Sequence, residues 1–111
     1  MTGMPLDILL VAVSQKGTSS RHRSLKTLAA ACDTDDELVR RCAAGGRPML
    51  AKITPYRDLM LTSSEMEQLV AELRSLDVSA SGSAVRIVDE VVALAERCAA
   101  DATTELHFIC D

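Results

Sequence analysis

The chain has 111 residues, of which 48% are hydrophobic and 25% are charged, and its formal net charge is −4. This length and composition are typical of a soluble globular protein and argue against disorder, so we expect residues 1–111 to form a single globular domain. Tyr56 and Phe108 are the only aromatic residues, and this scarcity disfavours the base-stacking surfaces of proteins that bind single-stranded nucleic acid.

The sequence also favours a cytoplasmic location without membrane association. Leu6–Val13 is an apolar run, but Asp7 interrupts it, no basic residue precedes it, and it is far shorter than a membrane span. We therefore interpret this run as part of the fold and not as a targeting signal. The cysteines are expected to be reduced thiols that behave as small apolar residues. They are Cys32, Cys42, Cys98 and Cys110.

In the first part of the chain, the residue pattern predicts one strand and two helices. Ile8–Val13 is a continuous apolar stretch with β-branched residues, which indicates a buried strand. The polar and basic stretch Ser14–Ser24 predicts an exposed loop. Apolar residues at helical spacing in Leu25–Asp33 predict a short helix, and a capping box at Thr34–Glu37 predicts a second helix that a glycine pair ends.

The middle of the chain predicts two strands and a helix. Met49–Thr54 alternates between apolar and polar residues, which is typical of a strand. We expect Leu59–Leu61 to be a short strand that returns antiparallel to it. Thr62–Glu65 is a second capping box, and Met66–Leu76 carries one apolar stripe, so the sequence predicts a helix there.

The last part of the chain predicts a long helix and a closing strand. Asp77–Ser83 is rich in serine and indicates a loop, whereas Ala84–Ala100 has the broad apolar face of a buried helix. Glu105–Cys110 alternates and predicts a strand. Together the elements predict an α+β domain, with about four helices packed on a small mixed sheet of three or four strands. The expected order is strand, helix, helix, strand, short strand, helix, helix, strand.

The residue patterns do not favour an enzyme, a metal site or a cofactor. His107 and Cys110 are three residues apart in a predicted strand, so they face opposite sides and do not bind one ion together. Lys16–Arg23 follows a strand, which is where phosphate-binding loops occur, but it lacks the glycine spacing of a P-loop. We therefore expect a non-catalytic protein, and the role of this basic loop stays open.

Charge is divided unevenly along the chain. Residues 61–111 carry ten acidic side chains against three arginines, a balance of −7, whereas residues 1–60 sum to +3. An acidic half of this kind repels nucleic acid and steers a basic protein toward one surface. We predict that exposed carboxylates of the C-terminal helices bind such a partner. The candidate residues are Glu65, Glu67, Glu72, Asp89, Glu90 and Glu96.

In size, acidity and mixed α+β pattern, and in its lack of a catalytic motif, the chain resembles the small immunity proteins of bacterial polymorphic toxins. The resemblance implies an inhibitor that binds a basic toxin domain, such as a nuclease, with carboxylates that mimic or displace the phosphate substrate. Two alternatives remain. The chain could be a subunit of a larger assembly that uses the helix Ala84–Ala100 as an interface, or a small phosphate- or nucleotide-binding domain that uses Lys16–Arg23.

Overall fold

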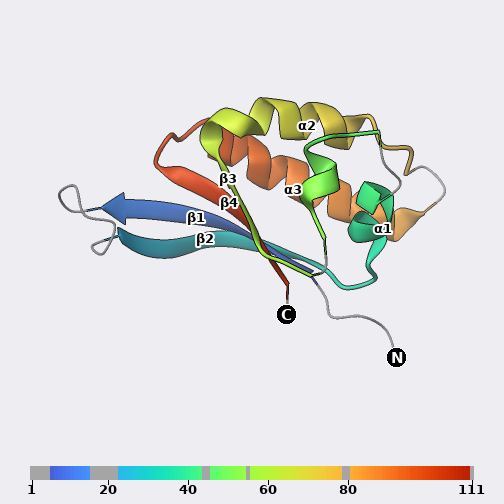
Figure 1. Cartoon of the computed structure of the whole chain (residues 1–111), viewed down its shortest axis with the longest axis horizontal. Helices are drawn as coiled ribbons and strands as arrows, with labels where there is room; N and C mark the ends of the chain where they lie inside the picture. Colours follow the sequence, from blue (N-terminus) through green and yellow to red (C-terminus); the bar gives the residue numbers. More distant parts are fainter. Residues whose placement is uncertain (1–5, 16–22, 44–45, 55, 79–80, 111) are drawn as a thin grey trace.

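The computed structural model describes the chain apart from residues 1–5, 16–22, 44–45, 55, 79–80 and 111. The described residues form a four-stranded sheet and three α-helices, so the fold is α+β (Figure 1). The strands are β1 (Leu6–Gln15), β2 (Arg23–Asp33), β3 (Leu59–Thr62) and β4 (Thr104–Cys110). The helices are α1 (Glu37–Ala43), α2 (Met66–Arg74) and α3 (Gly82–Ala99). Short 3-10 helices span Leu50–Lys52 and Ser63–Glu65.

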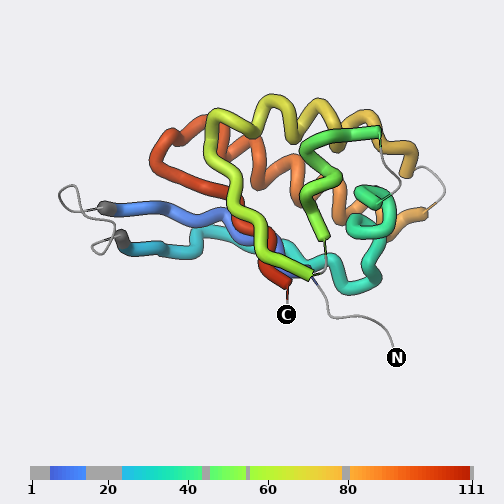
Figure 2. Tube along the Cα trace, in the orientation of Figure 1, coloured from blue at the N-terminus to red at the C-terminus, as the bar shows by residue number. Residues whose placement is uncertain are grey.

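The sheet is entirely antiparallel, in the strand order β2-β1-β4-β3, so the prediction of a mixed sheet was wrong. β1 is central, because Leu6 pairs with Asp33 of β2 on one side and with Cys110 of β4 on the other. β3 forms one edge beside β4, and β2 forms the other. The three α-helices lie together on one face of this sheet, as the ribbon and the Cα trace both show (Figures 1 and 2).

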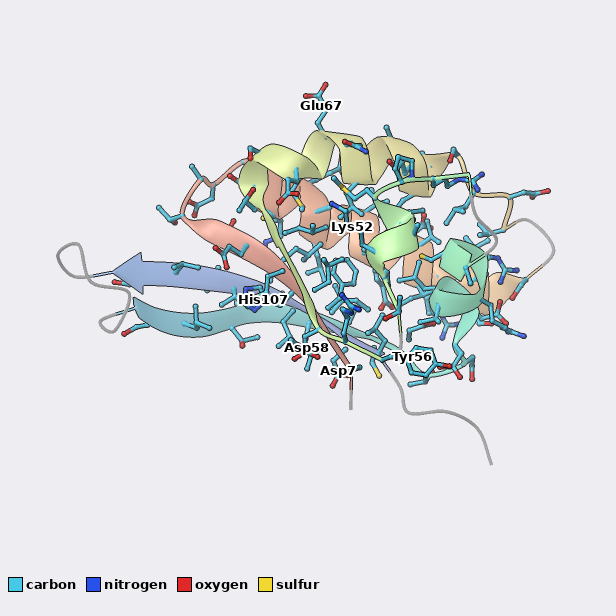
Figure 3. All side chains as sticks on the ribbon, in the orientation of Figure 1. Asp7, Lys52, Tyr56, Asp58, Glu67 and His107 are labelled. Carbon is cyan, nitrogen blue, oxygen red and sulfur yellow. The ribbon has the colours of Figure 1, made fainter. Side chains whose placement is uncertain are left out.

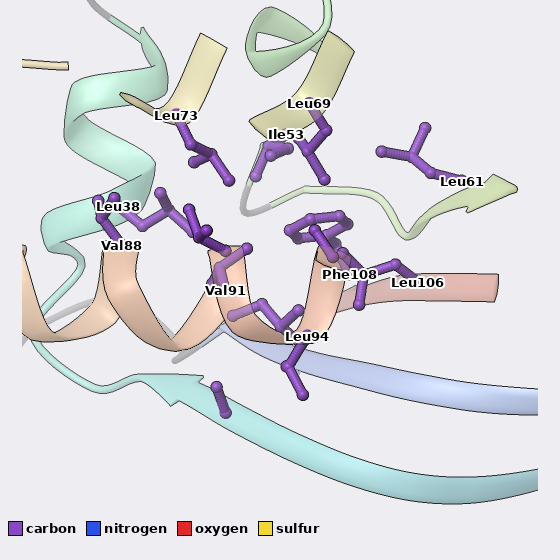
Figure 4. Close-up of a cluster of buried hydrophobic side chains, with 14 of the residues drawn as sticks. Leu38, Ile53, Leu61, Leu69, Leu73, Val88, Val91, Leu94, Leu106 and Phe108 are labelled. Atoms are coloured by element: carbon purple, nitrogen blue, oxygen red, sulfur yellow. The ribbon is translucent and has the colours of Figure 1, made fainter. Parts of the chain in front are cut away.

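The hydrophobic core lies between the helices and that face of the sheet. α3 lies across β1, β2 and β4, and α2 packs on α3. Figure 4 shows Leu106 and Phe108 of β4 in one cluster with Leu69 of α2 and Val91 of α3, and all four side chains are fully buried. Phe108 is the only aromatic residue of this core, which is otherwise mostly aliphatic. Within the described residues, no helix is both long and apolar enough to cross a membrane.

The predicted helix at Leu25–Asp33 was wrong, because this segment is the strand β2. The register of β2 against β1 shifts between Leu10 and Val11 of β1, so Leu28 of β2 has no residue opposite it. This β-bulge breaks the period-two pattern by which a strand is recognised, and the apolar residues then fall at helical spacing. The loss of this helix leaves three of the four expected α-helices.

The predicted strand at Met49–Thr54 was also wrong, because its middle is the 3-10 helix Leu50–Lys52. Met49, Leu50 and Ile53 are buried there, and the chain turns through them to fill one end of the core. The short strand predicted at Leu59–Leu61 is present as β3, but it pairs with β4 and not with the preceding segment.

The second half of the chain follows the sequence prediction closely. The capping box is formed, because the backbone N–H of Thr62 donates to Oε1 of Glu65 at 2.9 Å, and α2 begins directly after it. α3 buries a broad apolar face as expected, although Val85 is 37% exposed. The predicted closing strand is present as β4, and its residues Leu106 and Phe108 lie on the helix side of the sheet.

The start of α1 depends on Asp33 and not on the predicted cap Thr34. Asp33 is only 2% exposed. Its carboxylate accepts hydrogen bonds from the backbone N–H groups of Leu38 and Val39 at 3.1 Å. The chain reaches this geometry through Asp36, whose φ of 56° is in the left-handed region. Burial raises the pKa of Asp33, although the backbone hydrogen bonds partly oppose that shift.

Replacing Asp33 tests this capping assignment. Asp33→Ala should lower the free energy of unfolding by about 1–2 kcal/mol, because it leaves buried N–H groups at the start of α1 without an acceptor. Urea denaturation measures the loss. Thr34→Ala is the matched control at the neighbouring exposed position and should change stability little. A larger loss in Thr34→Ala than in Asp33→Ala would contradict the assignment.

Candidate partner-binding surface

Two of the six carboxylates predicted to bind a partner also have structural roles. Glu65 accepts the backbone N–H of Thr62 in the capping box that starts α2. Glu72 lies in α2 and holds the 3-10 helix: its Oε1 accepts the backbone N–H groups of Met49 at 3.0 Å and Leu50 at 2.9 Å. Its Oε2 accepts the side-chain amide of Gln68 at 2.7 Å. Both carboxylates are half-buried, so they are less accessible to a partner than fully exposed carboxylates are.

The other four predicted carboxylates are exposed on the helix layer. Figure 3 shows Glu67 of α2 pointing away from the molecule. Asp89, Glu90 and Glu96 lie on the exposed face of α3. Glu96 is 3.6 Å from Arg74, and because both side chains are about 60% exposed, this pair holds the carboxylate only weakly. The structure therefore places these four acidic residues together on one layer of the fold.

A cleft of about 190 Å³ lies where the turn between β2 and α1 meets the first half of α3. Its walls carry four carboxylates and one arginine, besides small polar and apolar groups. The charged lining residues are Asp33, Asp35, Glu37, Glu90 and Arg86. Glu90 thus connects the cleft with the exposed face of α3, where Asp89 precedes it without lining the cleft. We call Asp35, Asp89 and Glu90 together the acidic rim.

Neighbouring groups already engage two of the cleft carboxylates. Asp33 caps α1, and Glu37 forms ion pairs with Arg40 and Arg41 of the same helix. Asp35 and Glu90 have no hydrogen bond or ion pair with the described residues. The cleft therefore offers two carboxylates that a cationic group from outside the chain is able to contact.

The position of Asp35 in the cleft was not predicted from the sequence, where Thr34–Glu37 was interpreted as a helix-capping box. Helix capping accounts for Asp33 but not for Asp35, which is exposed. The missing information is tertiary: only the packing of α1 on α3 brings the turn before α1 close to Glu90. The available signal was that residues 33–37 contain more acidic side chains than the capping of one helix requires.

The cysteine and histidine side chains do not form a reactive centre within the described residues. Burial raises the pKa of Cys42 to about 12 and also raises that of Cys98, so both thiols are protonated at neutral pH. Cys110 donates its thiol to Asp58, whereas His107 lies on the opposite side of β4 with Nε2 2.9 Å from Oε1 of Glu105. No three metal-ligating side chains come together there. Most of the basic loop lies outside the described residues.

Comparison with known proteins does not add to this picture, because no protein family, curated protein sequence or solved structure matches the chain.

The structural role of Glu72 makes its effect on stability pH-dependent. Burial raises the pKa of Glu72, but hydrogen bonds from Gln68, Leu50 and Met49 outweigh it and hold the pKa below 4.5. Glu72→Gln should lower the free energy of unfolding by about 1 kcal/mol at neutral pH, because an amide group replaces one of its acceptors. A carboxylate whose pKa is lowered by folding stabilises the fold at pH values above its pKa in the unfolded chain. The loss of unfolding free energy in Glu72→Gln should therefore shrink as the pH falls below about 4.5.

Thermal unfolding between neutral pH and about pH 3 measures the effect. Glu67→Gln is the matched control, because Glu67 is on the same helix and exposed. It should change neither the stability nor the pH dependence. A loss in Glu72→Gln that stays constant across this pH range would contradict a role for the ionised carboxylate.

Proposed function

We propose that this chain is a non-catalytic protein-binding module that binds a basic partner through its acidic helix layer. The inhibitor proteins that the chain resembles in size, acidity and pattern act in this way on toxin domains. The single observation that carries the proposal is the acidic rim, where Asp35 and Glu90 line a cleft without a partner among the described residues and Asp89 is exposed beside it.

The size of the cleft supports a protein partner over a small molecule. Clefts that hold drug-sized ligands and cofactors are about 300–1,000 Å³ and mostly apolar. This cleft, at about 190 Å³, is smaller and is lined by charged groups. It suits one cationic side chain of a partner, and an arginine is the best candidate because its planar guanidinium binds carboxylates through two parallel hydrogen bonds.

The surrounding charges support a contribution to the association rate. Glu67, Asp89, Glu90 and Glu96 are exposed on α2 and α3 together with Arg74, Arg86 and Arg97, so four negative and three positive side chains sum to −1 on these two helices. The attraction for a basic surface is therefore local, at the adjacent carboxylates Asp89 and Glu90. Arg86 at the cleft orients this attraction, because a carboxylate of the partner can pair with it while the partner's cation meets Glu90. If the partner is a nuclease, carboxylates at these positions would occupy the site of its phosphate substrate.

Neutralising the acidic rim tests the proposal. The chain is used as bait in extracts of its native cells, alongside the triple variant Asp35→Asn, Asp89→Asn, Glu90→Asn. The control variant is Asp7→Asn, which removes one carboxylate from the sheet and none from the helix layer. We expect the wild type and the control to retain the same basic protein in near-equal amount, with release by salt. The triple variant should retain at least tenfold less, which corresponds to about 1.4 kcal/mol of binding energy.

Three outcomes would contradict the proposal: no stoichiometric partner, a partner that the triple variant retains equally well, or a complex that salt does not weaken. Circular dichroism of each bait confirms that the fold is intact. This check is informative because the three replaced carboxylates have no hydrogen-bond partner among the described residues, whereas Glu65 and Glu72 are left in place.

A further inference from the structure

The face of the sheet opposite the helices is not covered by any described element (Figures 1 and 2). Successive residues of a strand point to opposite faces, so the register of the sheet identifies the side chains on this open face. About half of them are apolar, and the polar ones include Thr27, Thr62 and Glu105. The apolar residues are Leu9, Val11 and Val13 of β1, Ile109 of β4, Met60 of β3, and Leu25 and Ala30 of β2.

This composition is unusual for a solvated face. Antiparallel sheets with one face in water normally carry polar residues at the outward positions. Here Met60 is 60% exposed and Leu25 is 55% exposed, and they come from the two opposite edge strands. Ala30, Leu9, His107 and Met60 form one row across the whole sheet. Exposed apolar side chains therefore lie on both edge strands of this face, whereas His107 and Val11 at its centre are shielded by their neighbours.

The polar groups at the centre of the open face are already satisfied within the chain. His107 is only 5% exposed, and its Nε2 lies 2.9 Å from Oε1 of Glu105 on the same face. Asp7 lies on this face near one end of β1, and Arg23 of β2 pairs with Gln15 at the other end of β1. Covering the face would therefore leave few charged groups without partners, which is the main cost of burying a polar surface.

We propose that a second copy of this chain covers the open face, so that two sheets pack face to face in a homodimer. The distribution of charge favours this occupant over a basic protein. The exposed acids Glu67, Asp89, Glu90 and Glu96 lie on the helix layer, on the opposite side of the sheet, whereas Asp58 is exposed beside β3. Two copies that pack through their sheets therefore hold these four acids apart. A basic partner is drawn to the helix layer instead, so the dimer is independent of the proposed partner binding.

The area of the face is sufficient for a weak dimer. Four strands of 10, 11, 4 and 7 residues, spaced about 4.8 Å apart with roughly 3.4 Å per residue, give a footprint of roughly 500 Å² per copy. The two copies together would bury about 1,000 Å², which is at the lower limit for a specific interface. We therefore expect a dimer that forms and dissociates in the micromolar range and not a permanent one.

Sedimentation equilibrium from about 1 to about 200 µM tests the proposal. The wild-type mass should rise from 11.9 kDa toward twice that value. Met60→Glu should weaken the dimer at least tenfold, because it places a carboxylate in an apolar interface. Val85→Glu is the matched control: Val85 is also an exposed apolar residue, but it lies on α3 in the helix layer, so its replacement should leave the dimer intact.

Leu25→Glu provides a second variant on the opposite edge strand and should weaken the dimer in the same way. Each variant is checked by circular dichroism, and both replaced side chains are more than half exposed, so the monomer fold should tolerate the change. A wild type that stays monomeric over the whole range would overturn the proposal. A dimer that Met60→Glu does not weaken would also overturn it, because dimers that pair only through the edge strand β2 predict that result. A dimer that Val85→Glu disrupts would overturn it as well.

Discussion

The packing of α3 on one face of the sheet is the contact on which the rest of the structure depends. Val91, Ala95 and Cys98 are fully buried on this helix, and α3 contacts three of the four strands as well as α1 and α2. All the described α-helices therefore gather on one side. The consequence is a two-layer molecule with two different outer surfaces: a helix layer that exposes charged residues, and a sheet face on which Met60 and Leu25 are exposed.

Carboxylates contribute to this fold as much as they contribute to its surface. Asp33 joins the end of β2 to α1, and Glu72 holds the 3-10 helix against α2. Both accept backbone N–H groups that would otherwise lack a partner where the chain is irregular. The acidity of the sequence therefore overstates the charge that is available to a partner, and the remaining exposed acids are the ones that define the helix layer.

Sequence patterns predicted the elements whose signals are local. The capping box at Thr62 and the alternation in β4 depend on neighbouring residues, and both are present. β2 was missed because the bulge at Leu28 interrupts its alternation, and the 3-10 helix was missed because its N–H groups are satisfied by Glu72, more than 20 residues away. The candidate site was predicted only in part for the same reason, since the cleft forms between segments that are distant in sequence.

The central claim is that charge and apolar surface are separated onto opposite layers, so that self-association and partner binding use different forces. The most direct test is the sedimentation equilibrium of the wild type at about 0.05 and about 0.5 M NaCl. We predict a dimer that is as stable or more stable at high salt, because salt screens repulsion between acidic layers and does not weaken apolar contacts. A dimer that dissociates at high salt would place charged groups in the interface and contradict this separation.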